Sequence, residues 1–297
     1  MLWILLEINT LSFCAITAKT SSESAKREKE SFIKYLIIQS VASIMLILSS
    51  LITKRTPRKY TLIRIIMVSS LILKRAGAPL FQWFIAVSKK ISWRNFTILL
   101  TWQKLAPTYL LIFQKKPIIF IPMVASILTG SILIVNKTQV KEILAYSSLF
   151  NLRWIIISIM IRIKTLLLFV SIYWIILILR IKPFKTRNAK EINSVKISSI
   201  PKEILFLIII MLGGIPPLLG FTIKWIIIIK ILSLKIEYLI TVILIFRAIN
   251  LFAYLRLVNF TNMAYSKNLN KRLKKNFFFL STALIFINTL SFVIITF

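Results

Sequence analysis

The sequence predicts an all-α protein, a polytopic bundle of transmembrane helices. Hydrophobic residues make up 58% of the 297-residue chain, and the mean hydropathy is +0.86; both exceed ordinary usage in soluble globular proteins. The apolar residues form runs close to the ~20 residues that cross a bilayer, and basic stretches separate these runs. We therefore expect residues 1–297 to form a single transmembrane domain without a sizeable soluble part.

About ten spans follow from the apolar runs. The first is apolar apart from Glu7, and a polar loop of mixed charge at 19–30 separates it from the second. Most of the spans are expected to be continuous helices, and these cover residues 1–17, 31–53, 94–113, 117–136, 138–160, 165–181, 236–258 and 277–297.

Two further spans are expected to be broken helices. The span at 60–84 carries Gly77 and Pro79. The span at 203–232 is too long for one simple crossing, and the run Gly-Gly-Ile-Pro-Pro at 213–217 divides it. Proline removes an amide donor and loosens a helix, so backbone carbonyls are freed at both places.

Interrupted helices at matching positions in two halves of a chain are typical of transporters built from inverted repeats. We therefore expect one half-repeat at about 1–113 and a second at about 117–258. A final helix at about 277–297 follows the second half-repeat.

Lys74 and Lys104 each lie in an otherwise apolar run and each precede a proline. An ionisable side chain at membrane depth costs roughly 2.5–3.5 kcal/mol on insertion scales, so such a residue usually has a function or a partner. The alternative is a lysine whose ammonium reaches the membrane surface, but apolar residues extend far on both sides of Lys104. These two lysines predict part of an ion path.

The composition largely excludes metal-based, haem-based and histidine-based chemistry. The chain has a single cysteine, Cys14, no histidine and no aspartate, so its eight acidic residues are all glutamates. Metal and haem sites and histidine-based acid–base catalysis are therefore not expected, and neither is a bound cofactor. The net charge of +32 lies mostly between apolar runs, which favours loops facing anionic membrane lipids over nucleic acid.

Three motifs carry a resemblance to a known family. The first combines Lys74-x-x-x-Ala-Pro-x-x-x-Trp with Leu-Leu-Thr-Trp-Gln-Lys104-x-Ala-Pro, the second is Gly-Gly-x-Pro-Pro-x-x-Gly-Phe-x-x-Lys224-Trp, and the third is Trp-Ile-Leu-Leu-Glu7-Ile-Asn. In order and spacing the chain resembles the family of chain 2, an antiporter-like membrane subunit, of the mitochondrial NADH:ubiquinone oxidoreductase (respiratory complex I). Weaker similarity appears at Lys34-Tyr35 with Gln39, and at Tyr-Ser-Ser 146–148.

The resemblance implies a function in proton translocation. It identifies Glu7, Lys74, Lys104 and Lys224 as proton-transfer residues, with Glu7 approaching Lys74, and it implies no redox centre in this chain. The expected partners are other membrane-arm subunits of the NADH dehydrogenase complex, and the expected location is the mitochondrial inner membrane. The family has two five-helix inverted repeats. Compared with that pattern, the spans expected here begin one helix inside the first repeat, so we expect this chain to be N-terminally shortened by one helix.

Several positions depart from the family pattern. Histidines of the family are replaced by Phe81 and Asn151, so proton steps assigned to those histidines cannot operate here by the same chemistry. The remaining departures change size or charge, and they are Leu5 for glycine, Lys89 for glutamate, Glu142 for a basic residue, Arg153 for glycine and Arg247 for an uncharged residue.

Two alternatives remain open. A stand-alone cation/proton antiporter would share the lysines and the broken helices, although such a chain should keep the full set of helices. A structural subunit that has lost pumping would explain the missing histidines and the additional arginines.

Overall fold

The computed structural model describes residues 2–18, 25–55, 61–114, 116–185, 213–214, 219–233 and 237–266, and the regular elements in these ranges are helical. The expectation of an all-α protein is confirmed for this part of the chain. The predicted span at 277–297, and the predicted start of the span at 203–232, lie outside the described residues.

The chain divides by its internal packing into two units. The first unit comprises Met1–Gly130 and Leu144–Met160, and the second comprises Ser131–Ile143 and Ile161–Phe297. The predicted half-repeat boundary near residues 113–117 concerns internal symmetry, which this division does not address, and it stays a prediction.

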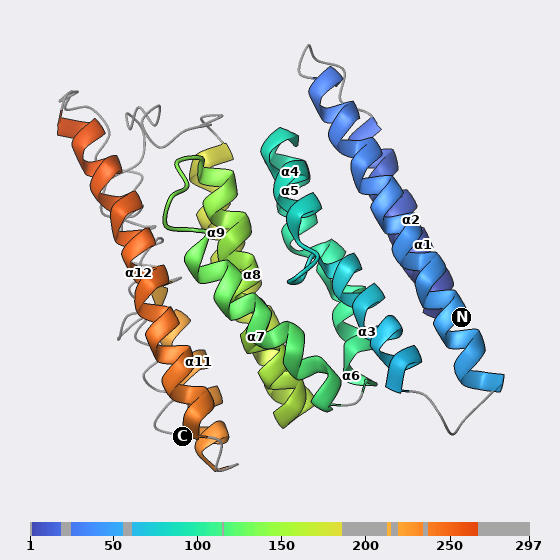
Figure 1. Ribbon diagram of the computed structural model, residues 1–297. Coiled ribbons are helices and arrows are strands. Elements are labelled where there is room, and N and C mark those ends of the chain that lie inside the picture. The colour runs from blue at the N-terminus through green and yellow to red at the C-terminus, as the bar shows by residue number, and fades with distance from the viewer. Residues whose placement is uncertain are drawn as a thin grey trace. The chain divides into compact units, whose positions relative to one another are not determined.

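In the first unit, the long helix α2 (Ala25–Arg55) is the element on which several others pack. Its neighbours are α1 (Leu2–Ala18), α3 (Thr61–Arg75) and α4 (Gln82–Lys90) (Figure 1). The rest of the unit consists of α5 (Trp93–Leu100), the 3₁₀ helix η1 (Trp102–Lys104), α6 (Leu105–Ile112), and most of α7 (Lys116–Ile132) and of α8 (Val140–Ile161).

In the second unit, α11 (Leu219–Leu232) packs against both α9 (Ile163–Lys185) and α12 (Glu237–Ser266). Gly213 and Gly214 are also described, just before α11 in the sequence. The φ angle of Gly214 is 69°, a left-handed conformation that ends a right-handed helix. The predicted interruption of the span at 203–232 is therefore present at Gly214.

The helices α2, α9 and α12 are longer than the sequence predicts, and α9 covers Ile163–Lys185 where the predicted span is 165–181. α2 begins at Ala25 rather than at residue 31, because the alanine, lysine, arginine and glutamate residues that precede its apolar run all favour helix. Glu30 and Lys34 also form a pair at 2.8 Å one turn apart, an arrangement that supports a helix. α12 likewise continues to Ser266, beyond the predicted end of its span at residue 258.

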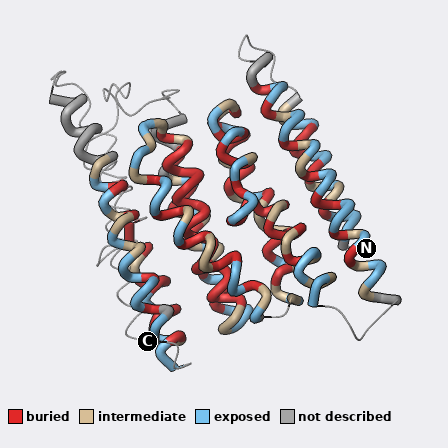
Figure 2. The backbone as a smooth tube through the Cα atoms, in the orientation of Figure 1, coloured by how far each residue is buried: buried red, intermediate tan, exposed pale blue. Residues whose placement is uncertain are grey.

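By length and composition, two of the described helices could cross a membrane by themselves. They cover Glu28–Thr53 and Val140–Ile161. Figure 2 shows how differently they are surrounded: the apolar part of α8 is 94% buried within the protein, whereas that of α2 is 28% buried and exposes a row of apolar side chains. Shorter apolar helices cover Trp3–Thr17, Pro117–Ile132 and Ile163–Leu179, and the total of about ten spans stays a prediction.

The predicted break near Gly77 and Pro79 is present, because α3 ends at Arg75 and α4 begins at Gln82. The amide of Gly77 donates to the carbonyl of Ile72 at 2.8 Å, and the amide of Ala76 donates to that of Leu73 at 3.1 Å. This pair of hydrogen bonds is a Schellman motif, which ends a helix in the left-handed region. Ala76 occupies that region with φ of 61°, where glycine is the usual residue.

The span at 94–113 is predicted to be continuous, and that prediction is wrong. α5 ends at Leu100, and η1 separates it from α6. A proline at position 107 cannot donate to the carbonyl of Gln103, its helical partner. The preceding turn tightens instead, since the amide of Lys104 donates to the carbonyl of Thr101 at 3.2 Å, three residues back. A third interruption therefore lies at Lys104 itself.

The backbones of α7 and α8 approach closely at Gly130. A methyl group added to Gly130 would lie 2.8 Å from the amide nitrogen of Phe150 and 3.0 Å from its Cα. Small residues allow helices in a membrane to pack backbone against backbone. A larger residue at this position would force the two helices apart.

We expect Gly130→Ala to destabilise the first unit by roughly 1–3 kcal/mol, the usual effect of overpacking. Gly213→Ala is the matched control, because its added methyl group would meet nothing closer than the Tyr254 ring at 3.8 Å. The measurement is the thermal stability of the purified variants in lipid or in their assembly. An equal or smaller loss of stability for Gly130→Ala contradicts the prediction.

Candidate functional site

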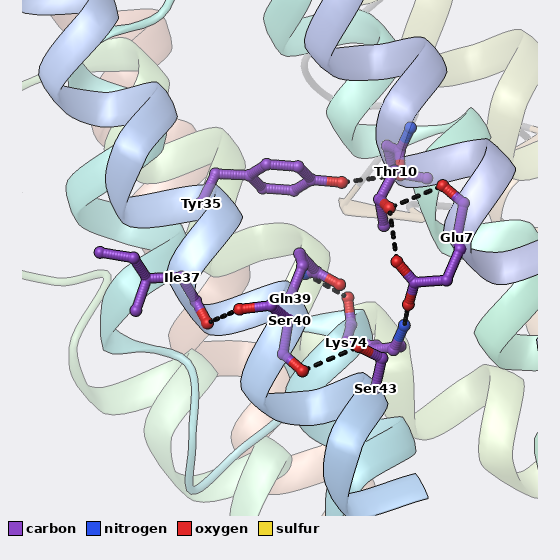
Figure 3. A network of polar contacts seen from close by, with 9 residues as sticks. Glu7, Thr10, Tyr35, Ile37, Gln39, Ser40, Ser43 and Lys74 are labelled. Carbon is purple, nitrogen blue, oxygen red and sulfur yellow. Dashed lines mark hydrogen bonds and ion pairs between the residues drawn. The ribbon is translucent and has the colours of Figure 1, made fainter. Parts of the chain in front are cut away.

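Glu7 and Lys74 form an ion pair between α1 and the last turn of α3. Glu7 Oε1 lies 3.5 Å from Lys74 Nζ, and Figure 3 shows the two side chains pointing toward each other. The Lys74 side chain is 1% exposed and that of Glu7 is 28% exposed. Thr10, one turn after Glu7, donates to the Glu7 carbonyl at 2.8 Å and lies 3.5 Å from Glu7 Oε2. The predicted approach of Glu7 to Lys74 is thus present.

The break in the helix after Lys74 shapes this pair. Because α3 ends at Arg75, the carbonyl of Lys74 has no amide of a following turn to accept from. Gln39 on α2 provides the missing donor, since its Nε2 donates to the Lys74 carbonyl at 3.3 Å (Figure 3). Both the ammonium and the carbonyl of Lys74 therefore have partners on other helices.

Lys104 ends the 3₁₀ helix η1 and reaches two neutral groups. Its Nζ donates to Ser148 Oγ of α8 at 2.9 Å and lies 4.5 Å from the centroid of the Phe84 ring of α4. A cation over an aromatic face is stabilised by ~0.5–2 kcal/mol, more where water is excluded. Lys104 is thus held by a hydroxyl and a ring, whereas Lys74 is held by a carboxylate.

Gln103 forms hydrogen bonds that connect the surroundings of Lys74 with those of Lys104. Tyr35 of α2 donates from its hydroxyl to Gln103 Oε1 at 3.0 Å. Gln103 Nε2 in turn contacts the carbonyl of Asn9 at 3.1 Å and Asn9 Oδ1 at 3.2 Å. Asn9 lies two residues after Glu7 on α1, and Gln103 directly precedes Lys104. Polar groups therefore connect the helix that carries Glu7 to the turn that carries Lys104.

Lys224 belongs to the second unit, where it is buried on α11. A methyl group added to Gly214 would lie 3.1 Å from Lys224 Nζ and 2.9 Å from Arg247 Nη2. Lys224 therefore packs against the turn at Gly214. Its predicted common depth with Lys74 and Lys104, which lie in the first unit, stays a prediction.

The side chains present offer little for a metal ion. Among the described residues, no group of three or more histidine, cysteine, aspartate or glutamate side chains could hold one. The chemistry available in this part of the chain is that of ammonium, carboxylate, amide and hydroxyl groups, which suits the binding and transfer of protons.

Comparison with known proteins identifies the family. The family described as NADH:quinone oxidoreductase/Mrp antiporter, TM, matches residues 1–250 of the chain. The chain belongs to this family.

Relatives and solved structures agree with that assignment. NADH-ubiquinone oxidoreductase chain 2 of Locusta migratoria is 33% identical over 265 residues, covering 86% of this chain and 77% of that protein. Chain 2 of Anopheles gambiae is 32% identical over 286 residues, with coverages of 93% and 83%. Members of the family are membrane-embedded, multi-pass proteins, and this chain is one of them.

The fold is shared with more distant proteins. A chain of respiratory complex I from Thermus thermophilus has a TM-score of 0.73 at 15% identity, covering 97% of this chain and 70% of that chain. A chain of the membrane-bound sulfane sulfur reductase, an archaeal respiratory membrane complex, has a TM-score of 0.76 at 14% identity, with coverages of 99% and 67%. These likenesses show the antiporter-like fold.

Two departures from the family pattern replace histidine with residues that carry no exchangeable charge. Phe81 is buried and packs edge-on against Tyr146, with ring centroids 6.2 Å apart. Asn151 is also buried, on α8. Neither side chain can accept and release a proton near neutral pH.

One further departure, Arg153, is accommodated by aromatic packing. Its side chain is fully buried, and its guanidinium carbon lies 3.4 Å from the centroid of the Phe150 ring. Guanidinium groups stack well on aromatic faces because they are planar and weakly hydrated. Arg153 therefore occupies the place of a small residue as a packed, fixed cation.

Sequence reasoning missed three residues that complete the site: Asn9, Gln103 and Ser148. Asn9 and Gln103 lie inside the motifs that carry the resemblance, Ser148 lies in the weaker match at 146–148, and each is a polar side chain in an apolar run. That pattern was a usable signal, since polar side chains within membrane helices usually find hydrogen-bond partners on neighbouring helices.

Gly214→Ala is expected to displace Lys224. Alanine in the left-handed region costs about 1–2 kcal/mol, and its methyl group would press on both Lys224 and Arg247. Gly213→Ala is the matched control, because its nearest neighbours would be Tyr254 and Leu251 at 3.8–4.0 Å. Differential labelling of Lys224 by an amine reagent measures the displacement. The same labelling in both variants and the parent protein contradicts it.

Proposed function

We propose that this chain is a proton-translocating core membrane subunit of the respiratory NADH:ubiquinone oxidoreductase in the mitochondrial inner membrane. Its partners are the other membrane-arm subunits of that complex and the surrounding lipids. Electron transfer from NADH to ubiquinone takes place elsewhere in the complex, and this chain moves protons through Glu7, Lys74, Lys104 and Lys224.

The observation that carries this function is the ion pair of Glu7 and Lys74 at a helix break. The lysine is almost fully buried, whereas the glutamate is partly exposed. Burial in an apolar medium disfavours a charged ammonium, and a nearby carboxylate favours it. The distance between Glu7 and Lys74 therefore controls whether Lys74 holds its proton, which is the property a pump needs.

A coupled movement of α1 against α3 would supply the switch. When the pair is closed, Lys74 keeps a proton; when it opens, the buried ammonium loses its counter-charge and releases the proton toward Lys104. Lys104, held by the Ser148 hydroxyl and the Phe84 ring, first passes its own proton onward and then, as a neutral amine, accepts the proton from Lys74 through intervening water. Electron transfer must then supply roughly 2.3 kcal/mol per charge for each 100 mV of membrane potential.

Gln103 gives this route its fixed geometry. Since Gln103 hydrogen-bonds to Tyr35 and Asn9, the turn that carries Lys104 is tied to both α1 and α2. A movement of α1 would therefore change the surroundings of both Lys74 and Lys104. Lys224, beside the break at Gly214, would serve the equivalent step in the second unit.

A structural subunit that has lost pumping is the second candidate. It is favoured by the burial of Phe81 and Asn151 at positions where the family has histidine. A stand-alone cation/proton antiporter is a further alternative, and it would exchange cations for protons without electron transfer. Measurements of proton movement with and without NADH oxidation distinguish all three.

Lys104→Met is expected to lower the number of protons translocated per electron in the intact complex. A positioned acid–base group typically contributes about 10²–10⁴ to the rate of a proton step, and methionine keeps the volume without the proton. Lys230→Met, on the last turn of α11, is the control and should leave the ratio unchanged. An unchanged ratio in an assembled Lys104→Met complex defeats the proposed pumping function.

Glu7→Gln should also lower the number of protons per electron, because the amide cannot stabilise a charged Lys74 as a carboxylate does. The control is Glu30→Gln, which removes an exposed carboxylate that pairs with Lys34 and Lys90; such surface pairs contribute little to stability. Proton uptake and NADH oxidation are followed in the same vesicles. If both variants behave alike, Glu7 has no special part in proton transfer.

A further inference from the structure

The double proline in the second unit leaves backbone carbonyls without helical donors. In an α-helix the carbonyl of residue i accepts from the amide of residue i+4. The helical partner of Gly213 would be Pro217, which has no amide hydrogen. Gly214, with φ of 69°, has left the helix altogether. The Gly213 carbonyl therefore needs a donor from outside its own helix, and the left-handed conformation of Gly214 takes its carbonyl out of the helical pattern.

Arg247 of α12 provides these donors. Its Nε donates to the Gly213 carbonyl at 3.4 Å, and its Nη2 donates to the Gly214 carbonyl. The guanidinium carbon lies 5.5 Å from the centroid of the Phe221 ring on α11. One side chain thus connects α12, the turn at Gly214 and α11.

Lys224 lies beside the same turn. Lys224 Nζ and Arg247 Nη2 each lie about 3 Å from the point where a Gly214 side chain would begin, so the two nitrogens are within about 6 Å of each other. The position of the turn therefore sets the surroundings of Lys224, and Arg247 holds that turn.

The cost of burying a charge and the cost of leaving a carbonyl without a donor together explain why an arginine is stable at position 247. A charged side chain in the middle of an apolar helix is costly. An unsatisfied carbonyl in the same medium adds a further cost. Arg247 and the two glycine carbonyls satisfy one another, so the charge and the break are each stable only in the presence of the other.

We propose that Arg247 is a positioning residue for Lys224. It supplies the hydrogen bond to the Gly213 carbonyl that Pro217 cannot make, it also donates to the Gly214 carbonyl, and it thereby fixes the Gly213–Gly214 turn against which Lys224 packs. The part of this inference that concerns proton transfer by Lys224 rests on the proposed function; the part that concerns the turn does not.

The test compares Arg247→Met, Arg247→Lys and Arg256→Met in the assembled complex. Methionine removes both donors and the charge, whereas lysine keeps the charge and can donate to one carbonyl. Arg256 is the matched control, because it lies on the same helix and its Nη2 donates to another backbone carbonyl, that of Lys137, at 2.6 Å. Each variant is read by amide hydrogen exchange in peptides covering residues 213–233 and by protons translocated per electron.

Arg247→Met should speed exchange in residues 213–233 by about tenfold, the effect of losing one to two hydrogen bonds, and should lower the proton ratio. Arg247→Lys should restore part of both. Arg256→Met should leave exchange in 213–233 as in the parent protein. Should Arg247→Met fail to assemble, Arg247→Lys alone must still show intermediate exchange.

Unchanged exchange in the Arg247 variants, or equal changes in Arg256→Met, would overturn the proposal. Faster exchange with an unchanged proton ratio would show that the turn is held by Arg247 but that Lys224 does not depend on it, which also overturns the positioning role. Failure of the pumping function itself is a separate result, because Lys104→Met would then leave the proton ratio unchanged whatever Arg247 does.

Discussion

A broken helix in an apolar medium must satisfy the carbonyls that the break exposes, and this requirement organises both units. In water such carbonyls would be hydrated, but in hydrocarbon each needs a donor from the protein. After Lys74 the donor is Gln39 of α2. At the Gly213–Gly214 turn it is Arg247 of α12. In each case the partner comes from a different helix, so the break itself ties helices together.

The same breaks lie beside the candidate lysines, and this placement links structure to function. A continuous helix would hold a lysine at a fixed height with its backbone fully bonded. A broken helix leaves a short segment whose position depends on a few side-chain contacts, such as those of Gln103 with Tyr35 and Asn9. Such a segment can take more than one position at a modest cost in free energy, which is what a change in the Glu7–Lys74 distance requires.

Much of this arrangement could be predicted from the sequence, although not all by the same route. Gly77 and Pro79 predict the break after Lys74 from backbone chemistry alone. The approach of Glu7 to Lys74 came only from the resemblance, because spacing within one helix does not reveal which other helix lies opposite. The turn at η1 was missed although Pro107 implies it, since the apolar run around Lys104 is long enough for an unbroken span. The early start of α2 was missed because charged residues were interpreted as loop, whereas alanine, lysine and glutamate also favour helix.

The cations of this chain divide into two chemical kinds, and the division explains how the departures from the family pattern are compatible with proton transfer. A buried lysine can lose its proton when its counter-charge moves away. Arginine keeps its proton in nearly every protein environment, so it acts as a fixed donor. Arg153 stacks on Phe150 and Arg247 bonds to the glycine carbonyls. These arginines therefore stabilise the framework, and in the proposed function the exchange of protons is left to Lys74, Lys104 and Lys224.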